Sequence, residues 1–269
     1  MGKNSRKEMP VDKASESELN QCYAEMKTSI NSERRENEKF NFDRLDTIFE
    51  IASKNRKLFP GANMGKNPTL EKYMNHWVLC YCKDIENPAS GKKANPKTSC
   101  SDPVVRAMIK QVKQIEDKVI DAEEKAHIIF MSAENVLGNL LEEYIANKIQ
   151  PYGWIWCAGQ TLNAIDFCNS KGNALLQIKN KSNSENSSAG KVRDGTIIRK
   201  WFRLGTSRKE GKLLPVYHWD ELNEIINEYA TKNVDENGNL LKKCDMSEKE
   251  FQEFIKDVIK KNPEIITEK

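Results

Sequence analysis

The chain has 269 residues and a formal net charge of +3, and 31% of its residues are charged. Its mean hydropathy is -0.73, and no apolar run approaches the roughly 20 residues that span a bilayer, which argues against a helical membrane protein. The first residues are polar and charged, unlike a signal peptide, and the seven cysteines are scattered, which is typical of reduced thiols. We therefore expect a cytoplasmic protein with no membrane partner. Its mild net charge permits a nucleic-acid partner without indicating one.

The first half of the chain, residues 1–130, is expected to be mainly helical, with a role in dimerisation or in clamping DNA. Residues 1–57 are polar but contain apolar positions at helical spacing, and a second helix is predicted around residues 73–81. Prolines and lysines predict a long basic loop over residues 87–103. An amphipathic helix is predicted over residues 104–130.

The second half, residues 131–269, has the pattern of a mixed α/β core. A strong apolar stripe predicts a helix over residues 132–149. Three strand-like segments follow, beginning at Trp154 and containing Asp166 and Gln177. Later elements are predicted from spacing and turn residues: a helix over 196–202, a strand over 213–217, a helix over 220–230, a turn at Asn237-Gly238 and a final helix after Ser247.

The most informative pattern is Asp166, followed eleven residues later by Gln177-Ile178-Lys179. Apolar and polar residues alternate in both pieces, and turn residues at 170–173 separate them, which predicts a β-hairpin. The period of two places Asp166, Gln177 and Lys179 on one face and their apolar neighbours on the opposite, core face. A carboxylate, an amide oxygen and an amine would then converge across adjacent strands.

These side chains suit a site for phosphodiester hydrolysis, in which a metal ion stabilises charge on the phosphate and lowers the pKa of an attacking water. Mg²⁺ prefers oxygen ligands and keeps several waters. Asp166 offers an anionic oxygen, Gln177 an amide oxygen, and Ile178 its main-chain carbonyl. Lys179 is a candidate to orient the nucleophilic water or to offset charge in the transition state.

The helix before the strands offers a further acid. Glu134, Glu142 and Glu143 are the candidates. Glu142 is favoured because the small Gly138, one turn earlier, allows a close approach of the helix, and Glu134 is the fallback.

On spacing alone, an ordinary hairpin with a solvated polar face is a better explanation of the Asp166 and Lys179 pattern than an active site. A carboxylate followed by a polar-x-Lys tripeptide is frequent in chains of this size. The preceding helix and the order of one helix and three strands strengthen the catalytic interpretation until the two explanations are about equal.

The motif Asp166…Gln177-x-Lys179 after Gly138…Glu142 resembles the PD-(D/E)xK nuclease superfamily, in the variant with glutamine at the second acidic position. A longer stretch of about 75 residues is similar to SinI-like type II restriction endonucleases. Ile165 stands where the superfamily pattern has proline, and the missing acid at Gln177 leaves the number of metal ions open. The matching blocks are Met131-Ser-Ala-Glu-Asn135, Trp154-Ile-Trp156, Ala164-Ile-Asp166-Phe167, Leu175-Leu-Gln-Ile-Lys-Asn180, Asn183-Ser-Glu-Asn-Ser-Ser188 and Ile198-Arg-Lys-Trp-Phe-Arg203.

The resemblance implies a restriction-endonuclease-like core, a mixed sheet flanked by helices. It implies Asp166 and Gln177 as metal-site residues, Lys179 as the catalytic lysine and Glu142 as the helix acid. It also implies Mg²⁺-dependent cleavage of double-stranded DNA by a homodimer at a short symmetric site. For SinI-like enzymes that site is of the GGWCC type, W being A or T.

Residues 180–209 are predicted to contact DNA. Basic side chains crowd into this segment, as phosphate neutralisation requires. Arginine, asparagine and glutamate are also the side-chain types that read base edges. A solvated helix and linker would have a similar composition. The candidate contact residues are Asn180, Lys181, Asn183, Glu185, Asn186, Arg193, Arg199, Lys200 and Arg203.

Other constellations are weaker. His76, Cys80, Cys82 and Cys100 could be imagined as a zinc site, but Cys-x-Cys is a poor spacing for tetrahedral zinc. Two rivals to a type II restriction endonuclease remain open: a Mrr-like nuclease acting on modified DNA, and a catalytically inactive DNA-binding protein on a nuclease fold.

Overall fold

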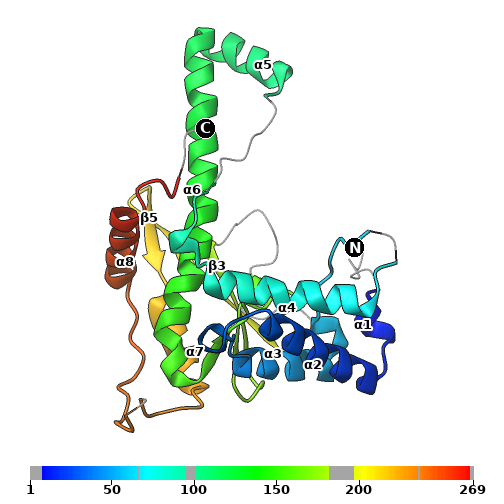
Figure 1. The fold of residues 1–269 in the computed structure, drawn as a ribbon. Coiled ribbons are helices and arrows are strands. Elements are labelled where there is room, and N and C mark those ends of the chain that lie inside the picture. The colour runs from blue at the N-terminus through cyan, green and yellow to red at the C-terminus, as the bar shows by residue number, and fades with distance from the viewer. Residues whose placement is uncertain (1–7, 66, 95–100, 182–196, 236, 267–269) are drawn as a thin grey trace. The chain divides into compact units, whose positions relative to one another are not determined.

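The computed structural model describes residues 8–65, 67–94, 101–181, 197–235 and 237–266. It divides into two compact units (Figure 1). The first combines Met1–Asn87 with Ile145–Glu248, and the second combines Pro88–Tyr144 with Lys249–Lys269. The N-terminal helices and the strands therefore form one compact unit, whereas the sequence pattern divides the chain at residue 130. The roles expected for the segments on either side of that residue remain predictions.

The first unit contains five α-helices among its described residues and one five-stranded sheet. The helices are α1 (Pro10–Lys13), α2 (Glu16–Ser32), α3 (Asp43–Lys54), α4 (Leu70–Glu86) and α7 (Trp219–Glu228). The strands are β1 (Trp154–Trp156), β2 (Phe167–Asn169), β3 (Leu175–Lys181), β4 (Ile198–Lys209) and β5 (Lys212–Tyr217). The second unit contains α5 (Pro103–Lys113), most of α6 (Asp117–Ile149) and, after its first residue, α8 (Glu248–Lys261).

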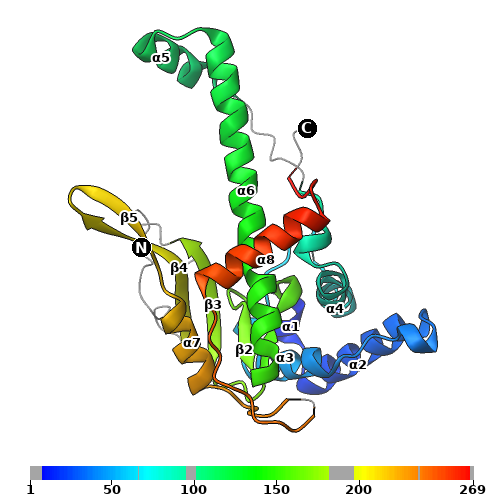
Figure 2. The same ribbon diagram turned by 90° about the vertical axis from the view of Figure 1, so that its left-hand side faces the viewer.

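The sheet has the strand order β1-β2-β3-β4-β5, with β3 and β4 parallel and the other neighbours antiparallel. The β3–β4 ladder ends at the pair Lys181 and Leu204. Beyond it, β4 continues to Lys209 and pairs with β5 alone. We call this two-stranded extension, residues 205–217, the outer ribbon; Figure 2 shows it in yellow, past the end of β3.

The mixed sheet with flanking helices and the helical N-terminal region confirm the predicted α/β class. The order α6, β1, β2, β3 is also as expected, and β5 and α7 lie close to the predicted 213–217 and 220–230. The helices predicted over 104–130 and 132–149 differ in their limits, because α5 ends at Lys113 and α6 is one continuous helix of 33 residues.

The helix predicted over 196–202 is wrong, because Ile198 begins strand β4. Ile198 is 3% exposed and packs in the core with the N-terminal helices, whereas Trp201 is 1% exposed and packs on Trp219 of α7. These two side chains lie on opposite faces of the strand, so the start of β4 is covered on both faces. The two buried residues are three apart, which imitates the spacing of a helix.

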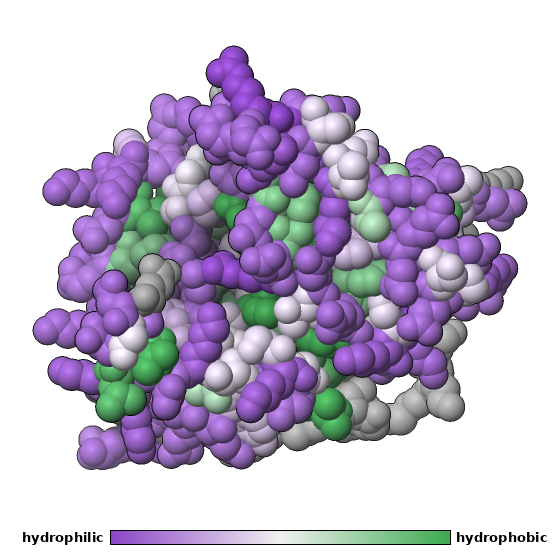
Figure 3. Space-filling view, turned by 60° about the horizontal axis from the view of Figure 1, so that its bottom comes forward, coloured by the Kyte–Doolittle hydropathy of each residue, from purple (hydrophilic) through white to green (hydrophobic). Residues whose placement is uncertain are grey.

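The face drawn in Figure 3 is largely hydrophilic, with apolar residues in small, separate patches. Among the described residues, no helix is long and apolar enough to cross a membrane.

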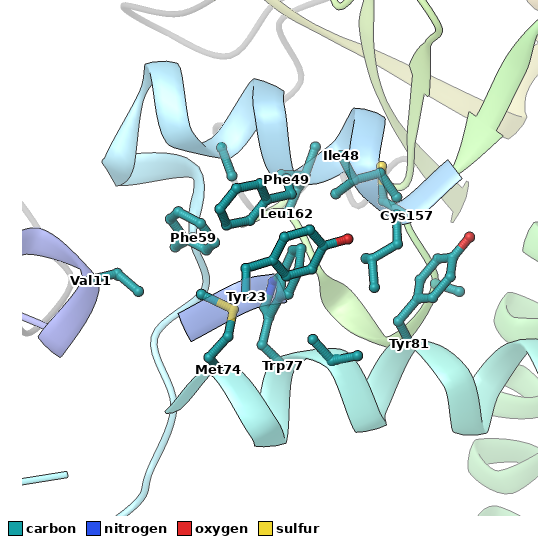
Figure 4. Close-up of a cluster of buried hydrophobic side chains, with 14 of the residues drawn as sticks. Val11, Tyr23, Ile48, Phe49, Phe59, Met74, Trp77, Tyr81, Cys157 and Leu162 are labelled. Carbon is teal, nitrogen blue, oxygen red and sulfur yellow. The ribbon is translucent and has the colours of Figure 1, made fainter. Parts of the chain in front are cut away.

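The core of the first unit is built on aromatic side chains from the N-terminal helices (Figure 4). Tyr23 stacks on Phe49 with ring centroids 4.0 Å apart, and Trp77 packs edge-on against Phe59 at 5.5 Å. The indole N–H of Trp77 donates to the carbonyl of Thr161 at 2.9 Å. This bond ties α4 to the loop between β1 and β2, so the N-terminal helices support the sheet directly.

The close approach of this loop to α4 depends on a glycine. Gly159 has φ +67, and a Cβ there would lie 2.5 Å from the backbone of Cys80 on α4. Only a residue without a side chain allows this approach of loop and helix.

Candidate active site

Asp166 lies at a bend immediately before β2, one residue outside the strand in which the pattern places it. Its N–H donates to the carbonyl of Leu176 at 2.9 Å, and its carbonyl accepts from the N–H of Cys157 at 2.9 Å. Its carboxylate oxygen Oδ2 accepts from the N–H of Ile178 at 2.6 Å. The backbone and the side chain of Asp166 are therefore both fixed by main-chain groups, which is the rigidity that a catalytic carboxylate needs.

The electrostatic environment of Asp166 is a balance of opposed effects. Burial raises the pKa of its carboxyl group, while the hydrogen bond from Ile178 and the charge of Lys179 lower it, and burial prevails. Partial removal of a carboxylate from water is costly unless a cation accompanies it. The site therefore favours a positive charge beside Asp166.

Strand β3 presents the rest of the motif. Leu176 and Ile178 are buried, Gln177 is half-buried and Lys179 is exposed. Gln177 and Lys179 share one face of the strand, which we call the site face. The predicted hairpin is thus present, with Phe167 of β2 paired with Leu176 of β3. The predicted alternation of buried and exposed side chains before Lys179 is present as well.

Oxygen atoms of three kinds meet the requirements of a hard divalent cation here. The N–H and C=O of one strand residue point toward the same edge of the strand, so the carbonyl of Ile178 points toward the edge that Asp166 occupies. Together with the carboxylate of Asp166 and the amide of Gln177, it would give a donor set made of oxygen atoms only, which is the ligand chemistry that Mg²⁺ prefers. Within the described residues no three His, Cys, Asp or Glu side chains cluster as a metal site would require, so a metal here would depend on neutral oxygen donors in addition to the Asp166 carboxylate.

The helix acid stays a prediction. Glu142 is half-buried and Glu134 is exposed on α6, and both belong to the second unit. Glu143 is 7% exposed and accepts hydrogen bonds from the N–H of Ser90 at 2.8 Å and from its hydroxyl at 2.5 Å. Glu143 therefore has a structural partner within its own unit.

The predicted DNA-contacting residues divide between the two faces of the sheet. Asn183, Glu185, Asn186 and Arg193 lie outside the described residues. The β3–β4 register sets Gln177 opposite Lys200, and Lys181 follows Lys179 by two positions on β3. Lys181 and Lys200 therefore belong to the site face.

Asn180, Arg199 and Arg203 belong to the opposite face, which is packed against α7. Arg203 is 7% exposed, and its guanidinium donates to Glu248 at 2.7 Å and to the side-chain oxygen of Asn180 at 2.9 Å. Arg199 lies over the ring of Tyr229 at 4.7 Å and donates to its hydroxyl. These three residues hold structural interactions, and DNA contact by them stays untested.

These two groups are not separated by the sequence pattern when the start of β4 is taken as a helix. The missed signal is the alternation of Arg199, Trp201 and Arg203 against Lys200 and Phe202, which has the period of a strand.

The imagined zinc residues are spread over α4. Cys80 lies 3.6 Å from His76 through its sulfur, whereas Cys82 is 2% exposed in the aromatic core. Cys100 lies outside the described residues.

Comparison with known proteins places this chain in a family. Residues 61–261 match the SinI restriction endonuclease family. The chain is 35% identical over 174 residues to the type II restriction enzyme Eco47I of Escherichia coli, a match that covers 63% of this chain and 66% of that enzyme. It is 42% identical over 121 residues to the type II restriction enzyme SinI of Salmonella infantis, covering 44% of this chain and 53% of that enzyme. Less than two thirds of each relative's length is matched. Because the family match spans more than half of the chain, the resemblance predicted from the motifs is confirmed: the chain belongs to the SinI restriction endonuclease family.

Proposed function

We propose that this protein is a type II restriction endonuclease that hydrolyses phosphodiester bonds of double-stranded DNA in the presence of Mg²⁺. The observation that supports it most is the Asp166 carboxylate, half-buried and fixed by the N–H of Ile178, beside the side chains of Gln177 and Lys179. The names of the two relatives, both type II restriction enzymes, support the same activity. The expected place of action is the cytoplasm.

Asp166, Gln177 and the carbonyl of Ile178 would hold the metal ion. The ion supplies charge stabilisation at the scissile phosphate and a lowered pKa for the attacking water. The N–H of Ile178 keeps the Asp166 carboxylate in one orientation. Lys179, exposed on the site face, is free to swing toward a bound phosphate and donate a hydrogen bond to the water or to a phosphate oxygen. Glu142 is the proposed additional acid.

The finer parts of the proposal concern the target and the assembly. We expect a homodimer, because a symmetric DNA site matches a two-fold axis in the protein. The family resemblance favours a GGWCC-type site.

Incubation of unmethylated phage DNA with the purified protein tests the proposal, with Mg²⁺ and in parallel with EDTA. We expect discrete fragments in the sample with Mg²⁺ and none in the sample with EDTA. The sequenced ends of the fragments should share one short symmetric site. The Asp166→Asn variant should give no fragments. Cleavage of methylated DNA only would instead indicate a modification-dependent nuclease, and binding without cleavage of either DNA would indicate a DNA-binding protein on a nuclease fold.

A further inference from the structure

The outer ribbon differs from the rest of the sheet in that its cations lack partners. Arg208, Lys209 and Lys212 are exposed, and within the described part of the chain their side chains form no ion pair or hydrogen bond. Arg199 and Arg203, earlier on the same strand, are both engaged. Glu210 is the single acid among residues 205–217. The ribbon therefore presents a net positive charge to solvent.

The tip of the ribbon sets two like charges against each other. Lys209 and Lys212 are direct cross-strand partners, and like charges in such a pair are destabilising. They flank a tight turn in which Glu210 has φ 52 and Gly211 has φ 77, the positive values of a type I′ hairpin. A turn this tight holds the two ammonium groups on one face, and an anion beside them would relieve their repulsion.

The ribbon continues the site face. Phe202 lies opposite Lys179, and Arg208 follows Phe202 by six residues, an even number that returns its side chain to the same face. At about 3.3 Å per residue, Arg208 is about 20 Å farther along the strand. That distance equals about six base-pair steps of about 3.4 Å, so the ribbon reaches bases close to a phosphate held at the site.

We propose that the outer ribbon enters the major groove of the DNA substrate, with Arg208 reading a base edge and Lys209 and Lys212 binding phosphates. The inference rests on the proposed function. A major groove about 12 Å wide admits a two-stranded β-ribbon, and arginine pairs with the O6 and N7 atoms of guanine. Leu213, opposite Arg208 and 64% exposed, is placed to contact a thymine methyl group in the same groove.

A second copy of the chain is the other occupant to consider, because β5 is an edge strand with exposed apolar side chains. Pro215 argues against it. Pro215 stands within β5 and has no N–H, so it interrupts the hydrogen bonds through which an added strand would pair. The unpaired cations of the ribbon also favour DNA, a polyanion, over the edge strand of a second copy as its binding partner.

The test is binding of duplex DNA in EDTA over a range of salt concentrations, so that cleavage does not interfere. The variants are Arg208→Ala and the pair Lys209→Gln/Lys212→Gln. The matched control is Lys242→Gln/Lys243→Gln, which removes the same charge from exposed lysines near Tyr152 at the start of β1, the other end of the sheet.

We expect Arg208→Ala to weaken binding of a duplex that contains the target by about 10- to 100-fold, with little change for an unrelated duplex. The tip variant should weaken both duplexes alike and reduce the slope of log affinity against log salt by about two. The proposal would be overturned if both variants bound DNA with the affinity, the salt dependence and the discrimination of the wild type. So would a change of oligomeric state with unchanged DNA affinity, since that outcome makes the ribbon a protein interface.

Cleavage by the same preparations separates the two proposals. Binding that depends on the ribbon, in a protein that cleaves no DNA with Mg²⁺, would refute the endonuclease and retain the ribbon. Site-specific cleavage that both ribbon variants perform like the wild type would retain the endonuclease and refute the ribbon. Absence of both duplex binding in EDTA and cleavage with Mg²⁺ by the wild type would refute both.

Discussion

Two arginines on one strand show how differently the inner sheet and the outer ribbon use the same residue. Arg203 lies where β4 is paired with β3 and covered by α7, and it is 7% exposed with Glu248 as its partner. Arg208 lies five residues on, exposed, where β4 pairs with β5 alone. A basic residue in the sequence therefore indicates a DNA contact only after its burial and its partners are known. The predictions below separate chemistry and stability in the inner sheet from recognition by the ribbon.

The largest effect is expected at the site face. Lys179→Ala should lower the rate of cleavage at saturating DNA by about 10²- to 10⁴-fold, because it removes the proposed proton-handling or charge-stabilising group. DNA affinity in EDTA should change far less. Single-turnover cleavage together with the binding assay measures both.

Lys181→Ala is the matched control for Lys179, because it removes a lysine from the same face two positions along β3. It should weaken binding and keep the single-turnover rate. Equal losses of rate in the two variants would contradict the assignment of Lys179, and Arg208→Ala should show the reverse pattern, a loss of discrimination with the rate retained.

The next largest effect concerns stability. The side chains of Arg203 and Glu248 are 8% and 17% exposed, and the two are 2.7 Å apart. Removing one partner of a buried pair leaves an uncompensated charge, so Arg203→Ala should lower the free energy of unfolding by about 3–5 kcal/mol. Urea unfolding measures it.

Arg208→Ala should change the free energy of unfolding by no more than about 0.5 kcal/mol, since the residue is exposed on the ribbon. A similar cost for both arginines would contradict the division of β4 into a structural half and a recognition half.

How far the sequence predicts this molecule depends on the range of the interactions. The hairpin from Asp166 to Lys179 is local, and its alternation is readable because Leu176 and Ile178 are buried while Lys179 is not. The pair Arg203 and Glu248 joins residues 45 apart, which no local pattern encodes. The hydrogen bond from the N–H of Ile178 to Asp166 belongs to the backbone and is likewise invisible in the residue types.

A smaller effect follows from the half-buried carboxylate. The folded protein holds the Asp166 proton more tightly than the unfolded chain, because burial raises the pKa. That contribution to stability is complete below the unfolded pKa of about 3.9 and is lost as the pH rises through the folded value. Without metal, Asp166→Asn should therefore be more stable than the wild type at neutral pH.

Urea unfolding in EDTA at several pH values measures the difference in the free energy of unfolding. This difference should grow as the pH rises above the pKa of the free carboxyl group and then level off. Addition of Mg²⁺ should stabilise the wild type and leave the variant unchanged, because only a state that binds the ion is stabilised by it. A pH-independent difference would show that the charge of Asp166 is already compensated within the protein.

The smallest effect tests the face packed on α7. Tyr229→Phe removes the hydroxyl that accepts from Arg199 and keeps the ring beneath the guanidinium at 4.7 Å. The loss of one hydrogen bond should cost about 1 kcal/mol in the free energy of unfolding, with cleavage and the salt dependence of DNA binding unchanged. A variant of normal stability whose binding has a different salt slope would show that Arg199 contacts phosphate, and that the α7 side of the sheet also takes part in recognition. The result decides whether Arg199, on the same face of β4 as Lys209 and opposite to Arg208, also serves DNA.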